Sequence, residues 1–185
     1  SWKELNNNTC KLINFLRENK IKEKDRIAAY TVNQIETVES FLATSAIGAI
    51  WSSCSPDFGT QGVIERFSQI KPKLLIITDR YYYNGKEINV LERLPVILKK
   101  IKSIKSVLIV NYPGKKNLKQ KKINGIKIFY FNKLKHKVDS KIKFKKFDFD
   151  KELAILYSSG TTGKPKCICH LSLIHISEPT RLHVI

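Results

Sequence analysis

Apolar residues recur along this chain at two spacings, that of an amphipathic helix and that of a short strand. Near the start, an apolar stripe at helical spacing is formed by Leu5, Thr9, Leu12, Ile13 and Leu16. The stretch Ser1-Trp2-Lys3-Glu4 matches a capping box, in which a serine and a glutamate three positions later satisfy free backbone N–H groups. The first residues are therefore predicted to form a helix that buries one side.

Further along, short strands alternate with helices. Strands are predicted at residues 26–31, 74–77, 107–110 and 126–131. A second helix is predicted to start at Asn33, and its inward face would be made by Val38, Phe41, Leu42, Ala46 and Ile47. A third is predicted at residues 60–70, ended by Pro72. A fourth, with Pro95 in its first turn, would bury Leu91, Leu94, Leu98, Ile101 and Ile104.

The strand at residues 74–77 is entirely apolar, which is typical of a parallel sheet covered on both faces. The alternation of strands and helices predicts an α/β fold with right-handed crossovers and a mostly parallel sheet flanked by helices. Another apolar run, at residues 153–157, predicts a further buried strand near the end of the chain.

The length of 185 residues allows one domain with a hydrophobic core. The net charge of +18 raises the question of a nucleic-acid partner. The charge is concentrated in residues 99–146, which hold 17 lysines, no arginine and a single acid, Asp139. Because nucleic-acid surfaces favour arginine for bidentate contacts, we expect no nucleic-acid partner and an exposed, lysine-rich connector at about 111–146. An anion-binding patch is the alternative.

The four cysteines, Cys10, Cys54, Cys167 and Cys169, do not have the paired spacing of a metal site, so we expect structural thiols and no bound metal among them. Nothing in their arrangement requires an oxidising compartment, which favours the cytosol. No apolar run approaches the roughly 20 residues that a membrane-spanning helix needs.

The stretch Tyr157-Ser158-Ser159-Gly160-Thr161-Thr162-Gly163-Lys164-Pro165-Lys166 carries the chemistry of a phosphate-binding loop. Glycines allow backbone N–H groups to turn toward an anion, hydroxyls add donors, and lysine adds positive charge. The loop is not a Walker A motif, because only two residues separate Gly160 from Gly163 and a proline follows Lys164. An ordinary P-loop NTPase is therefore excluded, and a simple polar turn is the alternative.

This loop resembles the nucleotide-phosphate loop of the adenylate-forming enzymes, the superfamily of acyl-CoA synthetases and luciferases. The stretch Gly48-Ala49-Ile50-Trp51-Ser52-Ser53-Cys54-Ser55-Pro56-Asp57-Phe58-Gly59 is similar to the acetoacetyl-CoA synthetase family. So are Arg66-Phe67-Ser68-Gln69-Ile70-Lys71-Pro72-Lys73 and Tyr83-Asn84-Gly85-Lys86-Glu87, in the same order. Acetyl-CoA synthetases share the loop but differ at residues 51–59. The resemblance covers residues 1–170 and implies part of an N-terminal AMP-binding domain of the adenylate-forming fold.

The resemblance implies a ligase that uses ATP with Mg²⁺ to convert acetoacetate into an adenylate and then transfers the acyl group to coenzyme A. Thr161 and Thr162 would donate to phosphate oxygens, Lys166 would pair with the loop or the phosphates, and the turn and further donors would come from Ser158, Ser159, Gly160 and Gly163. The catalytic residues and the Mg²⁺ ligand are expected beyond this chain, which would be inactive by itself.

A contact with coenzyme A is also implied. In acetyl-CoA synthetases two arginines at the positions of Tyr83 and Lys86 meet the nucleotide end of CoA. Lys86 is therefore expected to keep one charge contact, whereas Tyr83 can stack on adenine but cannot neutralise phosphate. Two surface residues in a turn are the alternative.

Residues 171–185 break the family pattern. The stretch Leu171-Ser172-Leu173-Ile174-His175-Ile176-Ser177-Glu178-Pro179-Thr180-Arg181 resembles the translation of a transposase mosaic-end sequencing adapter. We therefore expect a tail of non-native origin at 171–185, behind a domain at 1–170. A natural amphipathic strand is the alternative.

Two other functions stay open on the sequence alone. One is another short- or medium-chain acyl-CoA synthetase of the same superfamily. The other is a non-enzymatic basic module that binds RNA or an acidic membrane through residues 99–146. The oligomeric state is not indicated by any feature of the sequence.

Overall fold

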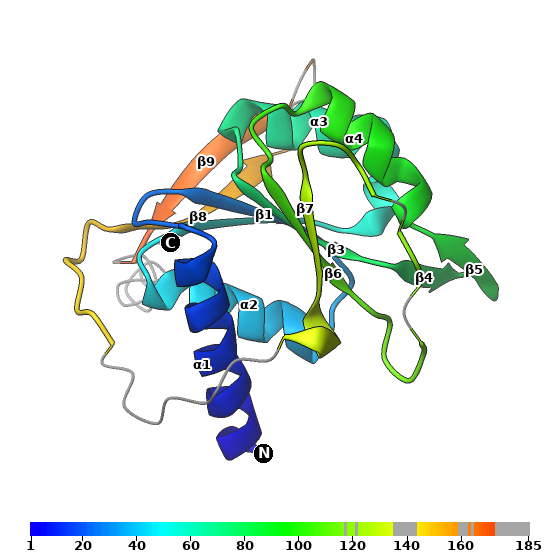
Figure 1. Ribbon diagram of the computed structural model, residues 1–185. Coiled ribbons are helices and arrows are strands. Elements are labelled where there is room, and N and C mark those ends of the chain that lie inside the picture. The colour runs from blue at the N-terminus through cyan, green and yellow to red at the C-terminus, as the bar shows by residue number, and fades with distance from the viewer. Residues whose placement is uncertain (117, 121, 135–143, 159–162, 164, 173–185) are drawn as a thin grey trace, which may run out of the picture.

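The structure, a computed structural model, describes residues 1–116, 118–120, 122–134, 144–158, 163 and 165–172. These residues form a seven-stranded sheet, a separate two-stranded hairpin, and helices on both faces of the sheet (Figure 1). The helices are α1 (Trp2–Glu18), α2 (Ile35–Ala46), α3 (Gly59–Ile70) and α4 (Leu94–Lys100), with short 3₁₀ turns η1 (Pro56–Phe58), η2 (Leu91–Arg93) and η3 (Phe131–Lys133). The strands are β1 (Arg26–Tyr30), β2 (Ile50–Cys54), β3 (Leu74–Thr78), β4 (Arg80–Tyr83), β5 (Lys86–Asn89), β6 (Ser106–Val110), β7 (Lys127–Tyr130), β8 (Glu152–Ser158) and β9 (Lys166–Leu171).

The large sheet has the strand order β7-β6-β3-β1-β2-β8-β9. Neighbouring strands are parallel throughout, except for the antiparallel pair β8 and β9. The expected α/β fold with a mostly parallel sheet flanked by helices is confirmed. Because the parallel strands all end at the same edge of the sheet, the segments that follow β1, β2, β3 and β8 lie at that edge.

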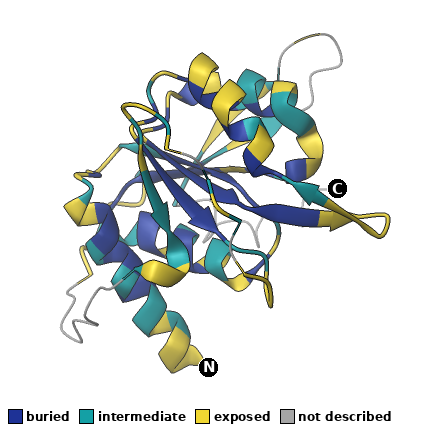
Figure 2. Ribbon diagram, turned by 45° about the vertical axis from the view of Figure 1, so that its right-hand side comes forward, coloured by how far each residue is buried: buried dark blue, intermediate teal, exposed yellow. Residues whose placement is uncertain are grey.

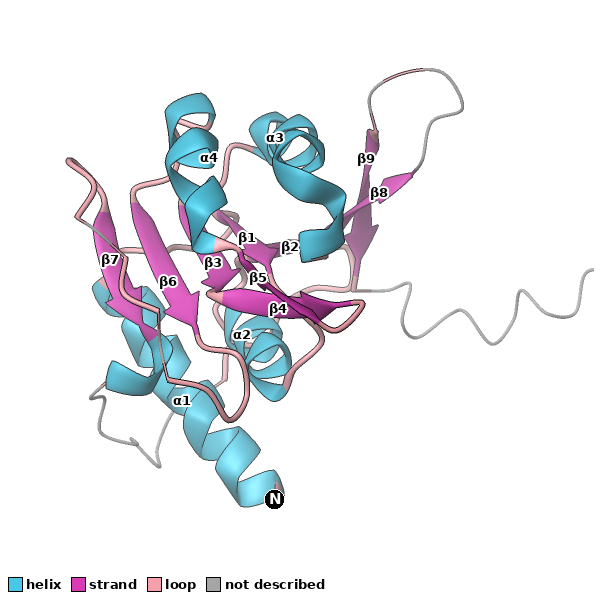
Figure 3. Ribbon diagram, turned by 90° about the vertical axis from the view of Figure 1, so that its right-hand side faces the viewer, coloured by secondary structure: helices cyan, strands magenta, loops and turns pink. Residues whose placement is uncertain are grey.

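Two helical layers cover the central strands, with α1 and α2 on one face and α3 and α4 on the other (Figure 3). Alternate residues of a strand point to opposite faces. In β1, Ala28 and Tyr30 belong to the core under α3 and α4, whereas Ile27 and Ala29 belong to the core over α1 and α2. Figure 2 shows the central strands as buried, and the expected two-sided burial of residues 74–77 is confirmed.

Helix α1 follows its sequence prediction. The Ser1 side chain accepts a hydrogen bond from the Glu4 backbone N–H, and the Glu4 carboxylate accepts one from the amino terminus, which completes the capping box. The apolar stripe is buried at Thr9, Leu12, Ile13 and Leu16.

The predicted inward face of α2 is confirmed in part. Phe41, Ala46 and Ile47 pack against the core, whereas Val38 and Leu42 are exposed. The fully buried positions of the helix are Glu39, Ser40, Ala43 and Thr44. The hydroxyls of Ser40 and Thr44 donate to backbone carbonyls within the helix at 2.6 and 2.7 Å, and the Glu39 carboxylate accepts from the Asn8 amide at 2.8 Å. The hydroxyls of Ser40 and Thr44 are buried at low cost because each has a partner. One Glu39 carboxylate oxygen has no hydrogen-bond partner among the described residues, and burial raises the pKa of this side chain. The hydrogen bonds of these polar side chains could not be anticipated from hydrophobic spacing.

Helix α4 is shorter than predicted, because it ends at Lys100. Ile101 and Ile104 are buried as expected, but they lie after the helix. Strand β2, the hairpin β4–β5 and strand β9 were not predicted. In β2 the polar residues Ser52 and Ser53 interrupt the apolar pattern on which a strand prediction depends.

The run at residues 153–157 does form a strand, β8, and its predicted burial is confirmed only in part. Ala154 is buried, and Leu153, Ile155 and Tyr157 pack against the core while half-buried, whereas Leu156 is 45% exposed. Strand β8 is the second strand from one end of the sheet, between β2 and the edge strand β9. The described part of the lysine-rich segment is not merely a solvated connector, since Leu118, Ile123 and Ile126 pack against the core under α3 and α4.

In the described residues there is no helix both long and apolar enough to cross a membrane. Of the expected tail at 171–185, the structure describes only Leu171 and Ser172. Leu171 is the last residue of β9 and is paired with Glu152 of β8. The backbone N–H of Ser172 donates to the Lys151 carbonyl at 2.9 Å. The remaining tail residues lie outside the described part, and the non-native origin of the tail stays a prediction.

Candidate functional site

The predicted phosphate loop connects β8 to β9. Ser158 and Lys166 are paired in register where the two strands meet the loop, and Tyr157 is paired with Cys167 one step further in. Because β8 runs parallel to β2, the loop leaves the sheet at the edge where the parallel strands end. The structure therefore brings Ser158 and Lys166 together across the loop ends, Ser158 half-buried and Lys166 exposed.

The middle of the loop is only partly described. Ser159, Gly160, Thr161 and Thr162 lie outside the described residues, so their predicted roles stay predictions. Gly163 is described and has a φ of 137°, a backbone conformation that side-chain-bearing residues rarely adopt. A glycine at this position is therefore required by the path of the chain.

The loop's first strand is anchored to the centre of the sheet. The Ser52 hydroxyl of β2 donates to the Ile155 carbonyl at 2.8 Å and is hydrogen-bonded to the Tyr157 hydroxyl at 3.0 Å. Burial raises the pKa of Tyr157, so its phenol stays neutral at physiological pH. The Tyr157 ring also packs against Phe67 of α3, with the ring centroids 6.5 Å apart.

The loop's second strand is held by α3. The Gln69 side-chain amide donates to the Pro165 carbonyl at 2.9 Å, and its oxygen lies 3.5 Å from the Cys167 sulfur. One turn earlier, the Arg66 guanidinium lies 4.1 Å from the centroid of the Phe58 ring and 5.8 Å from that of Tyr157. Arg66 and Gln69 lie in a segment that carries the family resemblance, residues 66–73, but the sequence analysis predicted no role at the loop for either residue.

Lys86 lies in the hairpin β4–β5, where it pairs with Tyr83 across the turn. The two turn residues, Asn84 and Gly85, have φ values of 48° and 74°, as a tight hairpin turn requires. Lys86 and Tyr83 are both exposed, Tyr83 by 65%. The two residues lie at an exposed turn, and the expected contact between Lys86 and coenzyme A stays a prediction.

Beside this hairpin is a pocket of about 310 Å³ whose lining holds four tyrosines, Tyr81, Tyr82, Tyr83 and Tyr112. Its remaining lining comes from the segments after β1 and β2, namely Val32, Asn33, Ser55 and Asp57. The rings of Tyr82 and Tyr112 meet edge to face with centroids 5.1 Å apart. Sequence reasoning missed this pocket, although three consecutive tyrosines before a turn were a visible signal.

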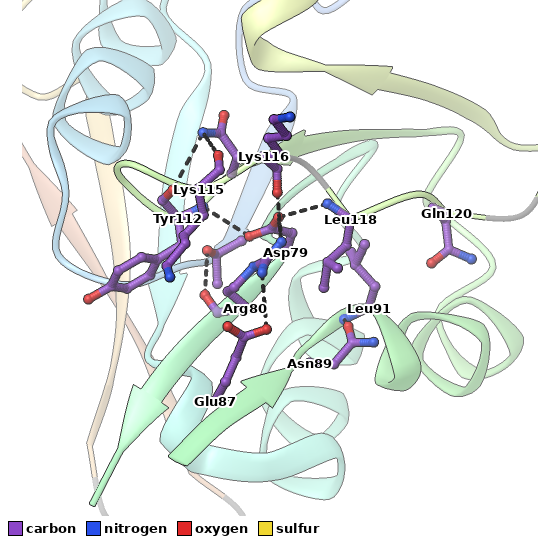
Figure 4. A network of polar contacts seen from close by, with 12 residues as sticks. Asp79, Arg80, Glu87, Asn89, Leu91, Tyr112, Lys115, Lys116, Leu118 and Gln120 are labelled. Carbon is purple, nitrogen blue, oxygen red and sulfur yellow. Dashed lines mark hydrogen bonds and ion pairs between the residues drawn. The ribbon is translucent and has the colours of Figure 1, made fainter. Parts of the chain in front are cut away.

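A buried acid fixes the hairpin to the loop after β6 (Figure 4). The Asp79 carboxylate, which is inaccessible to solvent, accepts from the backbone N–H groups of Tyr112 at 2.9 Å and Leu118 at 3.0 Å. It also pairs with the Arg80 guanidinium at 3.2 Å, which in turn reaches Glu87 at 3.0 Å and the Lys116 carbonyl at 2.7 Å. Two separate walls of the tyrosine pocket are thereby tied together.

Three of the cysteines, Cys54, Cys167 and Cys169, do not have activated thiols. Burial raises the pKa of Cys54 to about 12 and also raises the pKa values of Cys167 and Cys169. No group of three or more His, Cys, Asp or Glu side chains in the described part of the chain is arranged to hold a metal ion.

Comparison with known proteins gives consistent similarities. A family model described as AMP-binding enzyme matches residues 1–172. The acetoacetyl-CoA synthetase of Xenopus tropicalis is 43% identical over 159 residues, which are 84% of this chain and 24% of that protein. The acetoacetyl-coenzyme A synthetase of Rhizobium meliloti (strain 1021) is 41% identical over 182 residues, 96% of this chain and 28% of that protein.

Among solved structures, the acetoacetyl-CoA synthetase from Streptomyces lividans superimposes with a TM-score of 0.83 at 30% sequence identity. The match covers 98% of this chain and 27% of that one. The chain thus spans about a quarter of the length of the relatives that it matches.

Proposed function

This chain belongs to the AMP-binding enzyme family, and on that premise we propose that the complete protein is an acetoacetate–CoA ligase. The observation that carries the proposal is the position of the loop between β8 and β9, at the edge of the sheet where parallel strands end and ligands bind. The acetoacetyl-CoA synthetases to which the chain is similar support the choice of substrate.

The proposed reaction has two steps. A carboxylate oxygen of acetoacetate attacks the α-phosphorus of ATP, and pyrophosphate leaves with the electron pair of the broken P–O bond. The sulfur of coenzyme A then attacks the acyl carbon of the adenylate, AMP leaves, and the thiol proton is released. Both steps require a polyanion to be held still while charge develops on the leaving group.

In this proposal the loop between β8 and β9 holds the phosphates of ATP. Thr161 and Thr162 donate to phosphate oxygens, and Lys166, exposed at the start of β9, supplies positive charge. The turn and further donors come from Ser158, Ser159, Gly160 and Gly163. Mg²⁺ would accompany the nucleotide and neutralise phosphate charge, and we assign none of the described residues to it.

The second proposed site is the tyrosine pocket beside Lys86. Tyrosine rings can stack on adenine, and the Lys86 ammonium can contact a phosphate of the nucleotide end of coenzyme A. Both the pocket and the phosphate loop lie where parallel strands of the same sheet end, so one extended ligand site at that edge is supported.

The remaining parts of the proposal follow from the family. Residues 1–170 would form part of the N-terminal AMP-binding domain. The acyl pocket and catalytic residues would lie outside this chain, which is expected to be inactive by itself. The cytosol is the proposed location, since soluble substrates are all that the reaction needs.

The test is acetoacetate-dependent exchange of pyrophosphate into ATP by the complete protein, with acetate and medium-chain acids as competing substrates. Exchange that is fastest with acetoacetate is expected. Faster exchange with another acid would replace the substrate but keep the reaction. If no acid supports exchange, while RNA or acidic vesicles bind in a salt-dependent manner, the basic-module alternative holds instead.

A further inference from the structure

Arg93 joins four separate segments behind the tyrosine pocket. From η2, its guanidinium donates to the Pro56 carbonyl at 2.7 Å and to the Tyr30 hydroxyl. The same hydroxyl donates to the Pro56 carbonyl at 3.0 Å. The guanidinium also lies 6.0 Å from the centroid of the Tyr30 ring and 5.9 Å from that of Tyr81. The end of β1, the turn after β2, the start of the hairpin and η2 therefore meet at one cation.

These contacts reach both sides of the pocket. Pro56 lies between Ser55 and Asp57, which line it from the turn after β2, and Tyr81 lines it from the hairpin. No backbone pairing connects that turn to the hairpin, because β4 and β5 form a sheet of their own. Arg93 thus connects two walls that the backbone hydrogen bonds of the sheet leave independent.

The chemistry of this contact favours arginine over lysine. A guanidinium can donate to two acceptors in one plane while its face lies against an aromatic ring, whereas an ammonium makes point contacts only. None of the ion pairs between described residues includes Arg93. Its charge is satisfied by a carbonyl, a phenol and two rings, so it does not serve as half of a salt bridge.

We propose that Arg93 is a positioning residue for coenzyme A: it sets the separation of Asp57 and Tyr81, and with it the width of the pocket that receives the nucleotide. This inference rests on the proposed function of the tyrosine pocket. Arg93 itself need not touch the ligand, because it acts through Pro56 and Tyr81. Replacing Arg93 should therefore weaken binding of the nucleotide end of CoA and leave the rate of adenylate formation unchanged.

The experiment uses Arg93→Leu in the complete enzyme. Since two hydrogen bonds are lost, the KM for CoA should rise roughly five- to tenfold. The KM for pantetheine, which lacks the nucleotide, and the rate of ATP–pyrophosphate exchange should stay as in the wild type. Arg93→Lys should recover part of the effect, because one donor contact can be restored.

Arg26→Leu is the matched control. Arg26 also donates to a backbone carbonyl, that of Ile70 at 2.7 Å, but it lies at the start of β1, the opposite end of the sheet from the pocket. Its loss should lower the thermal midpoint without changing the KM for CoA. If Arg93→Leu raised the KM values for CoA and pantetheine equally, or lowered exchange as well, Arg93 would be a general stabiliser and the inference would be wrong.

Lys86→Ala, measured in parallel, tests the proposed CoA site independently of the positioning role of Arg93. A raised KM for CoA in Lys86→Ala with an unchanged one in Arg93→Leu would overturn the role of Arg93 and leave the proposed CoA site standing. An unchanged KM in both, in an enzyme that still forms acetoacetyl-CoA, would remove the CoA site from the tyrosine pocket altogether.

Discussion

The hydroxyls of Ser52 and Tyr157 are hydrogen-bonded at 3.0 Å across 105 residues of sequence. Ser52 belongs to β2, and Tyr157 belongs to β8, the strand that leads into the candidate phosphate loop. The Ser52 hydroxyl also donates to the Ile155 carbonyl of β8. The buried Ser52 hydroxyl therefore adds two hydrogen bonds to the attachment of β8, which otherwise rests on a short register with β2 and on the packing of Tyr157 against Phe67.

We expect Ser52→Ala to destabilise the complete protein by about 1 kcal/mol, because a buried carbonyl and a buried phenol each lose a partner. Equilibrium urea unfolding measures the change. Ser45→Ala is the control, since the Ser45 hydroxyl donates only to the Phe41 carbonyl within its own helix. That control should stay within about 0.5 kcal/mol of the wild type. Equal losses in both variants would contradict the anchoring role of Ser52.

In the phosphate loop, Thr162→Val keeps the side-chain shape but removes the hydroxyl, and Lys166→Ala removes a charge. Each should lower the rate of ATP–pyrophosphate exchange roughly tenfold or more, since a hydrogen bond to a charged group is lost. Lys164→Ala should leave the rate unchanged, because that lysine is expected to be solvated. Unchanged exchange in both Thr162→Val and Lys166→Ala would remove the loop from phosphate binding.

Lys86→Ala should raise the KM for CoA and leave ATP–pyrophosphate exchange intact, because CoA enters only the second half-reaction. The comparison variant is Lys127→Ala, which removes an exposed lysine at the start of the edge strand β7. If both variants shift the KM for CoA alike, the effect comes from the overall positive charge and the specific contact is refuted.

Asp79→Asn should destabilise the protein by about 3 kcal/mol, because it breaks a buried ion pair and leaves one of the bound N–H groups facing an amide. Asp25→Asn serves as its control. Asp25 pairs at 2.7 Å with Lys73, a side chain that is 48% exposed, and loss of such a pair should cost about 1 kcal/mol or less. Unfolding free energies from urea titrations compare the two, and a loss at Asp79 no larger than at Asp25 would be inconsistent with the network described here.

Stability should fall at alkaline pH, and Cys54 should contribute to the fall. Burial raises the pKa of its thiol from 9.0 to about 12, so between these values the unfolded chain loses the proton while the folded chain keeps it. The folded state then binds more protons, and its stability decreases as pH rises through this window. Urea unfolding from pH 8 to 11 should show a shallower decrease for Cys54→Ala. An identical slope in wild type and variant would place the alkaline sensitivity elsewhere.

Local sequence was sufficient to predict an element wherever its structure depends on residues within that element. The capping box of Ser1 and Glu4, the apolar strand at 74–77 and the helix over 60–70 were all predictable, because caps and hydrophobic periods act over a few residues. The phosphate loop was likewise identifiable, since its glycines, hydroxyls and lysine are contiguous.

Prediction failed where partners come from distant segments. The inward face of α2 was misassigned in part, because the buried Glu39 has its hydrogen-bond partner, Asn8, in α1, which apolar spacing within α2 does not indicate. The burial of β8 was overestimated because the number of strands and helices around it depends on sheet order, which hydrophobic spacing does not encode.

The sequence by itself therefore determined the class of fold, the order of most elements and the family, and it located the candidate phosphate loop, since each depends on patterns or motifs that are contiguous in the chain. Only the tertiary structure decided which residues hold that loop and which form the tyrosine pocket. Ser52, Asp79 and Arg93 act on segments far away in sequence. Their roles exist only once parallel pairing has brought the ends of β1, β2, β3 and β8 to one edge of the sheet.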